Sequence, residues 1–164
     1  ISFSILRYGN VFGSRGSVFN EILSNPKNFN LTDERMTRFH ITLDSAVKLC
    51  LWAIEHSIGS DIIVPKLPSY KLIDFVKAFA PNSKIKITGI RPGEKIHEEM
   101  ISINDSLNTL DLGDKYLICA ENYKEKILKY FSKKIKVKPV KNNFSYSSDK
   151  NIFLSIKELQ KSKI

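Results

Sequence analysis

Five arginines stand out in a chain that otherwise carries its positive charge on lysine. The 164 residues include 21 lysines but only Arg7, Arg15, Arg35, Arg38 and Arg91. Because a planar guanidinium binds phosphate oxygens in pairs, which a lysine ammonium cannot do, these arginines are candidate oxyanion ligands. Three of them lie beside glycine or turn residues, in "GSRGS", "MTRF" and "RPGEK". The plainer alternative for each is a surface ion pair.

Two of these arginines follow apolar, strand-like runs. The stretch "RYGNVFGSRGS" comes directly after "ISFSIL", and "RPGEK" comes directly after "KIKITGI". In an open α/β sheet, ligands bind beyond the carboxyl ends of the strands, in the loops that follow them. A loop with Asn10 and Arg15 can offer backbone amides, a side-chain amide and a guanidinium to a charged ligand. The residues alone therefore predict an anionic, phosphorylated ligand. The glycine-rich loop lacks the G-x-x-x-x-G-K-[ST] signature of P-loop proteins.

Strand and helix patterns alternate up to about residue 90, which predicts an α/β architecture. We expect helices over 18–24, from an Asp44 cap to near Gly59, and from a Ser69 cap to Phe79. The strands are expected over 1–8, in two short pieces within 28–42, at 61–65 and at 84–90.

The pattern changes after Arg91. We expect a turn, then an edge strand with Ile96, Glu98 and Met100 on one side in preference to a short helix, and a hairpin that turns at Gly113. A lysine-rich helix follows, and Ser155 with Glu158 forms a capping box for a terminal helix.

The formal net charge of +9 is confined to one part of the chain. Residues 1–114 hold thirteen basic and thirteen acidic residues, whereas residues 115–164 hold thirteen lysines and four acids. A solvated helix face explains this excess better than a nucleic-acid stripe. Cys50 and Cys119 stand in apolar runs and are expected to be reduced core residues. His56 and His97 lack metal-ligand spacing, so we expect no metal site.

Five motifs in order resemble the C-terminal half of the inverting UDP-N-acetylglucosamine 4,6-dehydratases, within the extended short-chain dehydrogenase/reductase superfamily. They are "RYGNVFGSRGS", "LTDERMTRFHITLDSAV", "DIIVPKLPSYKLIDFVKAFAP", "GIRPGEKIHEEMIS" and "FSYSSDKN" with "LSIKEL". The resemblance implies the last strands of a Rossmann-type sheet plus a smaller α/β substrate-binding domain. Residues 1–17 would form the late strand and loop, and residues 18–164 the substrate-binding part with its tail.

The same resemblance implies a redox-neutral dehydration that uses NADP and feeds pseudaminic-acid-type or other surface glycans. The family's dinucleotide fingerprint and its catalytic tyrosine and lysine, spaced Y-x-x-x-K, would precede Ile1. We expect neither pattern in this chain, hence no catalytic residue in it and no activity from it alone. Ile1 lies inside an apolar run, which suggests a piece of a longer chain.

By motif position, the resemblance implies substrate contacts from Asn10, Arg15, Arg38, Arg91 and Glu94. Arg91 would pair with the UDP diphosphate, and Glu94 would accept hydrogen bonds from ribose hydroxyls. Tyr8 and Gly9 would lie near the nicotinamide.

The chain departs from the family at His40, where a large aromatic residue is usual, and we expect His40 to serve in packing. Arg35 is expected to be a surface turn residue. The expected partners are a UDP-sugar and either the missing N-terminal half or further copies of the chain, and the expected location is the cytoplasm. The alternative is a UDP-sugar or anion-binding module without chemistry.

Overall fold

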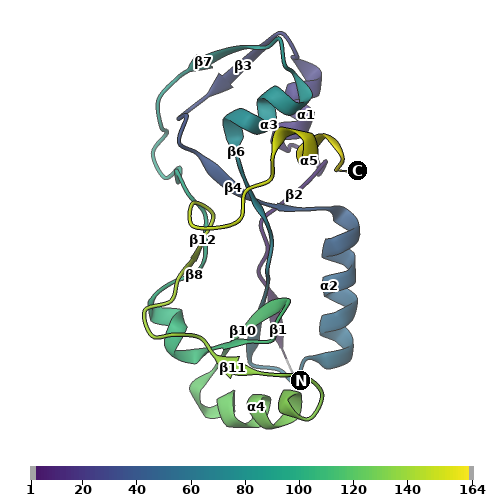
Figure 1. The fold of residues 1–164 in the computed structure, drawn as a ribbon, viewed down its shortest axis with the longest axis vertical. Coiled ribbons are helices and arrows are strands. Elements are labelled where there is room, and N and C mark those ends of the chain that lie inside the picture. The colour runs from purple at the N-terminus through teal and green to yellow at the C-terminus, as the bar shows by residue number, and fades with distance from the viewer. Residues whose placement is uncertain (1–2, 163–164) are drawn as a thin grey trace. The chain divides into compact units, whose positions relative to one another are not determined.

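Two units, interleaved along the chain, make up this computed structural model, which describes residues 3–162 (Figure 1). Unit 1 contains the residues up to Tyr8, residues 46–66 and residues 99–146. Unit 2 contains residues 9–45, residues 67–98 and the residues from 147 onward. The predicted division after residue 17 stays a prediction.

Unit 1 is built on a five-stranded sheet in the order β1-β5-β10-β9-β11. Only β1 and β5 run parallel, and the other neighbouring strands are antiparallel. The strands are β1 (Ser4–Leu6), β5 (Asp61–Pro65), β10 (Lys115–Cys119), β9 (Thr109–Asp111) and β11 (Lys138–Pro139). The unit also contains β8 (Glu99–Ile101), the short helices η1 (Asn104–Asn108) and η2 (Glu121–Tyr123), α4 (Lys124–Ser132) and most of α2 (Leu43–His56).

The core of unit 1 joins α2 and α4 to the sheet. Leu49 from α2, and Ile127 and Phe131 from α4, are buried in one cluster with strand residues such as Ile63 and Leu117. The buried residues of α4 are Ile127 and Phe131, which lie four positions apart on one face of the helix. The lysines of α4 lie on its other faces, away from this cluster. The lysine-rich segment therefore forms the amphipathic helix that was predicted.

Unit 2 contains two small sheets and three helices. Strands β2 (Asn10–Val11), β4 (Thr37–Ile41) and β6 (Ser69–Lys71) form one sheet, in which β2 is parallel and β6 antiparallel to β4. Strands β3 (Asn28–Leu31) and β7 (Lys84–Ile87) form a parallel pair. The helices are α1 (Val18–Ser24), α3 (Leu72–Phe79) and α5 (Ile156–Gln160), and β12 (Tyr146–Ser147) lies where the chain enters this unit for the last time.

Aromatic rings dominate the core of unit 2. Phe12 from the loop after β2 lies 4.6 Å from Phe19 of α1 and 5.9 Å from Phe75 of α3, measured between ring centroids. Phe79 lies 5.6 Å from the same Phe12 ring. The loop after β2 is thus anchored by a buried ring from within the glycine-rich stretch.

Several sequence predictions are confirmed by these elements. The fold is α/β, α1 covers Val18–Ser24, and β9 and β10 form a hairpin that turns at Gly113, whose φ is 99°. Both hydrogen bonds of the capping box between Ser155 and Glu158 are present. The first two residues of the strand expected over 1–8, including Ile1, lie outside the described residues.

Several element boundaries differ from the prediction, among them that of the strand expected at 84–90, which ends at Ile87. Ser69 is not a helix cap: it lies in β6, where its N–H donates to Ile152 O and its carbonyl accepts from Leu154 N–H, so α3 starts at Leu72. The preceding long helix starts at Leu43, because Thr42 Oγ1, rather than Asp44, accepts the N–H of Ser45.

The strand expected through Ile96, Glu98 and Met100 is shorter than predicted. Strand β8 covers only Glu99–Ile101. Ile96 and Glu98 instead contact β4: Ile96 O accepts the N–H of Thr37, and the Glu98 carboxylate accepts the N–H of Phe39.

Candidate anion-binding turns of unit 2

The five arginines divide by what their guanidinium groups contact. Within unit 1, Arg7 Nη1 donates to Met100 O at 2.7 Å and lies 3.6 Å from Asp105 Oδ2. Within unit 2, Arg35 donates from Nε and Nη2 to both carboxylate oxygens of Asp33, at 2.9 and 2.7 Å. These hydrogen bonds lower the pKa of Asp33 to about 2. Arg35 is therefore a surface turn residue, as predicted.

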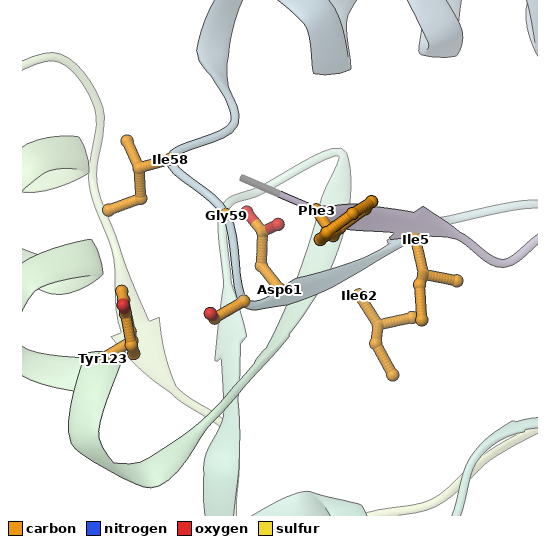
Figure 2. Close-up of a pocket in the computed structure, with 8 residues that line it drawn as sticks. Phe3, Ile5, Ile58, Gly59, Asp61, Ile62 and Tyr123 are labelled. Carbon is orange, nitrogen blue, oxygen red and sulfur yellow. The ribbon is translucent and has the colours of Figure 1, made fainter. Parts of the chain in front are cut away.

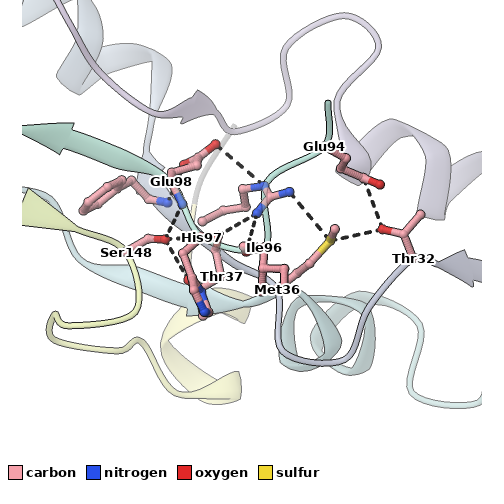
Figure 3. Close-up of polar contacts among 10 residues, drawn as sticks. Thr32, Met36, Thr37, Glu94, Ile96, His97, Glu98 and Ser148 are labelled. Carbon is pink, nitrogen blue, oxygen red and sulfur yellow. Dashed lines mark hydrogen bonds and ion pairs between the residues drawn. The ribbon is translucent and has the colours of Figure 1, made fainter. Parts of the chain in front are cut away.

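Arg38 belongs to a polar cluster of unit 2. Figure 3 labels its partners Thr37, Ile96 and Glu98. Its Nη1 donates to the carbonyls of Thr37 at 2.8 Å and Ile96 at 3.0 Å, and its Nε lies 3.7 Å from Glu98 Oε1. The side chain is only 14% exposed. The guanidinium thus fastens β4 to residues 96–98, while its predicted contact with substrate stays a prediction.

Ser148 joins the tail to the same cluster. This fully buried serine contacts Thr37 Oγ1 at 2.7 Å, donates to Thr37 O, and accepts the N–H of Glu98 at 2.9 Å. Thr37 Oγ1 also lies 2.8 Å from Nδ1 of His97. Desolvation by burial raises the pKa of Glu98 above its usual value. These side chains hold residues 97–98, which follow the Glu94 turn in the chain.

Glu94 is fixed from two sides. Its Oε2 accepts the backbone N–H of Arg91 at 3.2 Å, and its Oε1 accepts the hydroxyl of Thr32 at 3.1 Å. Figure 3 shows the next contact, from the Thr32 hydroxyl to Met36 Sδ, which also lies 3.7 Å from Nη2 of Arg38. A carboxylate has about four acceptor positions, so two remain for other donors. The ribose contact predicted for Glu94 is compatible with this arrangement and stays a prediction.

Arg15 and Arg91 differ from the other three arginines. Both are exposed, and neither side chain has a hydrogen bond or ion pair with a described residue. Gly16, with φ of 74°, follows Arg15, and Gly93, with φ of 81°, lies two residues after Arg91. Such left-handed backbone favours glycine and makes a tight turn. Unit 2 therefore presents two free guanidinium groups on glycine-containing turns.

Asn10 lies on β2 opposite His40 of β4. Its side chain is exposed and forms no hydrogen bond with a described residue. It lines a hollow of about 20 Å³, which has room for one water molecule but not for a nucleotide. The structure leaves the substrate contact of Asn10 as a prediction.

His40 packs as expected. It is 7% exposed, and its ring lies 5.5 Å from Phe12 and 6.0 Å from Tyr70, measured between centroids. Desolvation by burial lowers its pKa, and Nε2 lies 3.0 Å from the hydroxyl of Ser162. The imidazole takes the place of a core aromatic ring.

Tyr8 and Gly9, the residues predicted to lie near a cofactor, have local structural roles. Tyr8 packs against the core of unit 1. Gly9 begins unit 2, and a Cβ there would lie 2.6 Å from Cβ of Phe39. Its missing side chain thus lets the backbone approach β4. These two residues do not form a dinucleotide site by themselves, and their nearness to a nicotinamide stays a prediction.

One expectation about catalytic spacing is wrong. The Y-x-x-x-K pattern does occur, at Tyr130 with Lys134 and at Tyr146 with Lys150, and Tyr146 is buried. Lys134 Nζ donates to the Tyr130 hydroxyl at 3.2 Å and lies 4.7 Å from the ring centroid. The contact is exposed, at the end of the lysine-rich helix. It is an i to i+4 surface pair of the kind that helices commonly form.

The described residues contain no group of three or more His, Cys, Asp or Glu side chains that could hold a metal ion. No described helix has the length and apolar character needed to cross a membrane. Cys50 and Cys119 are free thiols, and burial raises the pKa of Cys119 to about 12. Cys119 is a core residue, as predicted, whereas Cys50 is half-buried and lines a surface hollow instead of the core.

Sequence reasoning missed the residues that hold the Arg91 turn. Thr32 and Thr37 lie in one of the motifs quoted above and Ser148 in another, but no motif indicates a contact between them, and Ser148 lies 111 positions from its partner Thr37. The only local signal was the three-residue spacing between Arg91 and Glu94, which suits a turn closed by a carboxylate.

Known proteins resemble this chain over most of its length. Residues 1–120 match the family described as "Polysaccharide biosynthesis protein". An inverting UDP-N-acetylglucosamine 4,6-dehydratase of Campylobacter jejuni is 44% identical over 96% of this chain and 49% of its own length. A UDP-glucose 4-epimerase of Rickettsia canadensis is 38% identical over 77% of this chain and 39% of its own length.

A solved structure agrees with these matches. The X-ray structure of Pen from Bacillus thuringiensis superimposes with a TM-score of 0.76 at 32% identity, over 97% of this chain and 48% of that protein. This chain therefore spans about half the length of the relatives that it matches.

Proposed function

Since this chain belongs to the polysaccharide biosynthesis protein family, we propose that it is the nucleotide-sugar-binding half of an inverting UDP-N-acetylglucosamine 4,6-dehydratase. The identity of 44% to such an enzyme, over 96% of the chain, supports the substrate class. The relatives' names favour a dehydratase over a binding module without chemistry.

The observation that carries the proposal is the free guanidinium of Arg91 above a turn closed by Glu94. Three of the five arginines are already used by partners within their own units. Arg91 and Arg15 keep their donors available for the oxygens of a diphosphate. Since Glu94 is held by Thr32, the turn is ordered before a ligand arrives, which reduces the entropy lost on binding.

We assign the substrate roles as follows. Arg91 pairs with the diphosphate, and Glu94 accepts hydrogen bonds from the ribose hydroxyls. The sugar and diphosphate site is lined by Asn10, Arg15 and Arg38. NADP is the proposed cofactor of the whole enzyme, held mainly by the other half. No step of hydride or proton transfer is assigned to a residue of this chain.

Two further parts of the proposal concern setting and partners. Free thiols at Cys50 and Cys119 support a reducing compartment, and we propose the cytoplasm. The partners are a UDP-sugar and a polypeptide that supplies the other half of the relatives' length, or further copies of the chain.

Calorimetry of the 164-residue chain with UDP tests the nucleotide site. Losing one charge-assisted contact costs about 1.5–3 kcal/mol, so Arg91→Ala should weaken binding about tenfold or more. Arg35→Ala is the matched control, because Arg35 is exposed but already paired with Asp33. Failure of UDP to bind, or equal effects of the two substitutions, contradicts the proposal.

A second measurement tests the absence of catalysis. The chain, incubated with UDP-N-acetylglucosamine and NADP, should form no 4-keto product. Product formation by this chain alone would show that the essential groups lie within it.

A further inference from the structure

The lysines near the end of unit 1 gather in one stretch of the chain. Residues 124–141, which include α4 and β11, hold eight lysines and a single acidic residue, Glu125. Their formal charge of +7 is most of the chain's +9. Every lysine of this stretch except Lys124 is exposed. We call these seven exposed side chains the lysine surface.

Acidic side chains do not neutralise the lysine surface. None of its lysines forms an ion pair with a carboxylate of residues 3–162. Asp111 lies opposite Lys138 in the sheet register, but its carboxylate bonds to Nζ of Lys66 at 2.7 Å. Lys126 and Lys129 are three positions apart on α4, where like charges repel each other. An anionic partner would relieve this repulsion.

A protein partner does not suit this surface. The cores of protein interfaces are rich in aromatic residues and arginine and poor in lysine. The apolar side of α4 is already used, because Ile127 and Phe131 are buried in the core of unit 1. Within residues 124–141, the exposed large hydrophobic side chain is Ile135, at 40%. The lysine surface thus offers a partner charge and little apolar area.

Nucleic acid does not suit this surface either. Proteins that bind nucleic acid stack bases on free aromatic rings and use arginine forks on base edges, whereas residues 124–141 contain no arginine. The two tyrosine rings beside the lysines are not free to stack on a base. Figure 2 shows Tyr123 lining a hollow of about 320 Å³ with Ile58, and Nζ of Lys126 lies 5.5 Å from the centroid of the tyrosine ring. Nζ of Lys134 lies 4.7 Å from the ring centroid of Tyr130.

We propose that the lysine surface binds the headgroups of an anionic lipid bilayer. Clusters of about four to eight basic residues on a helix are typical of proteins that dock on such membranes, where lysine point charges are sufficient. Ile135 lies between Lys134 and Lys136 in the chain and adds one apolar contact. The inference goes beyond the proposed function, because it uses no residue that was assigned to the nucleotide or the sugar.

Sedimentation of the 164-residue chain with lipid vesicles tests this inference. The chain should bind vesicles that contain phosphatidylglycerol, and it should not bind vesicles of phosphatidylcholine alone. Since salt screens exposed charges, raising the salt concentration from about 0.05 M to about 0.5 M should weaken the binding at least tenfold.

A matched pair of double variants locates the surface. One lysine near such a membrane contributes about fivefold in affinity, so Lys133→Gln with Lys136→Gln should weaken vesicle binding at least tenfold. Lys84→Gln with Lys86→Gln removes the same charge from exposed positions of β7 in unit 2 and should change the binding less than threefold. All four lysines are exposed, so both variants should fold, and their thermal unfolding serves as the check.

Every other outcome overturns the inference. These outcomes are no binding to the phosphatidylglycerol vesicles, equal binding to the neutral vesicles, binding that salt does not weaken, and equal effects of the two double variants. Tighter binding to duplex DNA or to polyglutamate than to the vesicles, at the same salt concentration, also overturns it. UDP calorimetry on the same samples keeps the two proposals apart. A chain that binds the vesicles but not UDP would remove the nucleotide site and leave the lysine surface standing.

Discussion

The substitution Ser148→Ala should destabilise unit 2 by more than its small change in volume suggests. The serine is fully buried, and its hydroxyl serves Thr37 and Glu98 together. Alanine removes the acceptor of the Glu98 N–H, and a buried donor left without a partner costs about 1–3 kcal/mol. The lost hydrogen bonds to Thr37 add about 0.5–1.5 kcal/mol, although Thr37 Oγ1 keeps its hydrogen bond with Nδ1 of His97. We expect a total loss of about 2–4 kcal/mol.

Urea unfolding, followed by far-UV circular dichroism and by hydrogen exchange of residues 97–98, measures this loss. Ser24→Ala is the control, because the Ser24 hydroxyl bonds a backbone carbonyl but lies in solvent. It should cost less than about 0.5 kcal/mol.

A double-mutant cycle with Thr37→Val tests whether the two hydroxyls act together. Residues in direct contact show coupling of about 0.5–3 kcal/mol, so the double variant should lose less than the sum of the single variants. Strict additivity, or a Ser148→Ala loss no greater than that of Ser24→Ala, would refute the reasoning.

Three further outcomes are expected. Gly9→Ala should cost about 1–3 kcal/mol in urea unfolding, because its Cβ would lie 2.6 Å from Cβ of Phe39; a neutral effect would contradict this close approach. Phe131→Ala should cost about 3–5 kcal/mol through a cavity in unit 1, and hydrogen exchange should rise there; exchange that rises equally in unit 2 would argue against separate cores. Burial raises the pKa of Glu98, so the folded state binds the carboxyl proton more tightly than the unfolded state does. The wild-type protein should therefore lose stability relative to Glu98→Gln as the pH rises from below 4.5 to 7. A difference in stability that stays constant over this pH range would show that Glu98 does not titrate in this way.

What could be read from the sequence was local. The capping box of Ser155 and Glu158 spans three residues, and the hairpin at Gly113 needs only its own turn, so both were predicted correctly. The buried positions of α4 followed from their helical spacing. These features depend on neighbours within a few residues, where propensity and periodicity act.

What was missed depends on contacts between distant segments. Ser69 has the residue type of a helix cap, but its backbone pairs with the segment around Phe153, more than 80 positions away in the sequence. Likewise, the cluster of Thr37, Glu98 and Ser148 gathers polar side chains that no motif links. For the candidate site, glycine and arginine spacing identified the turns, but which arginines stay free depended on partners that only the folded chain brings together.

The interleaving of the two units limits how the gene can be divided. The chain passes between them five times, after Tyr8, Ser45, Lys66, Glu98 and Tyr146. Cutting the coding sequence at any one of these points would divide the residues of at least one unit between the two products. Swapping either unit for that of a relative would require replacing three separate stretches at once, so recombination within this gene should preserve function only when both units are inherited together.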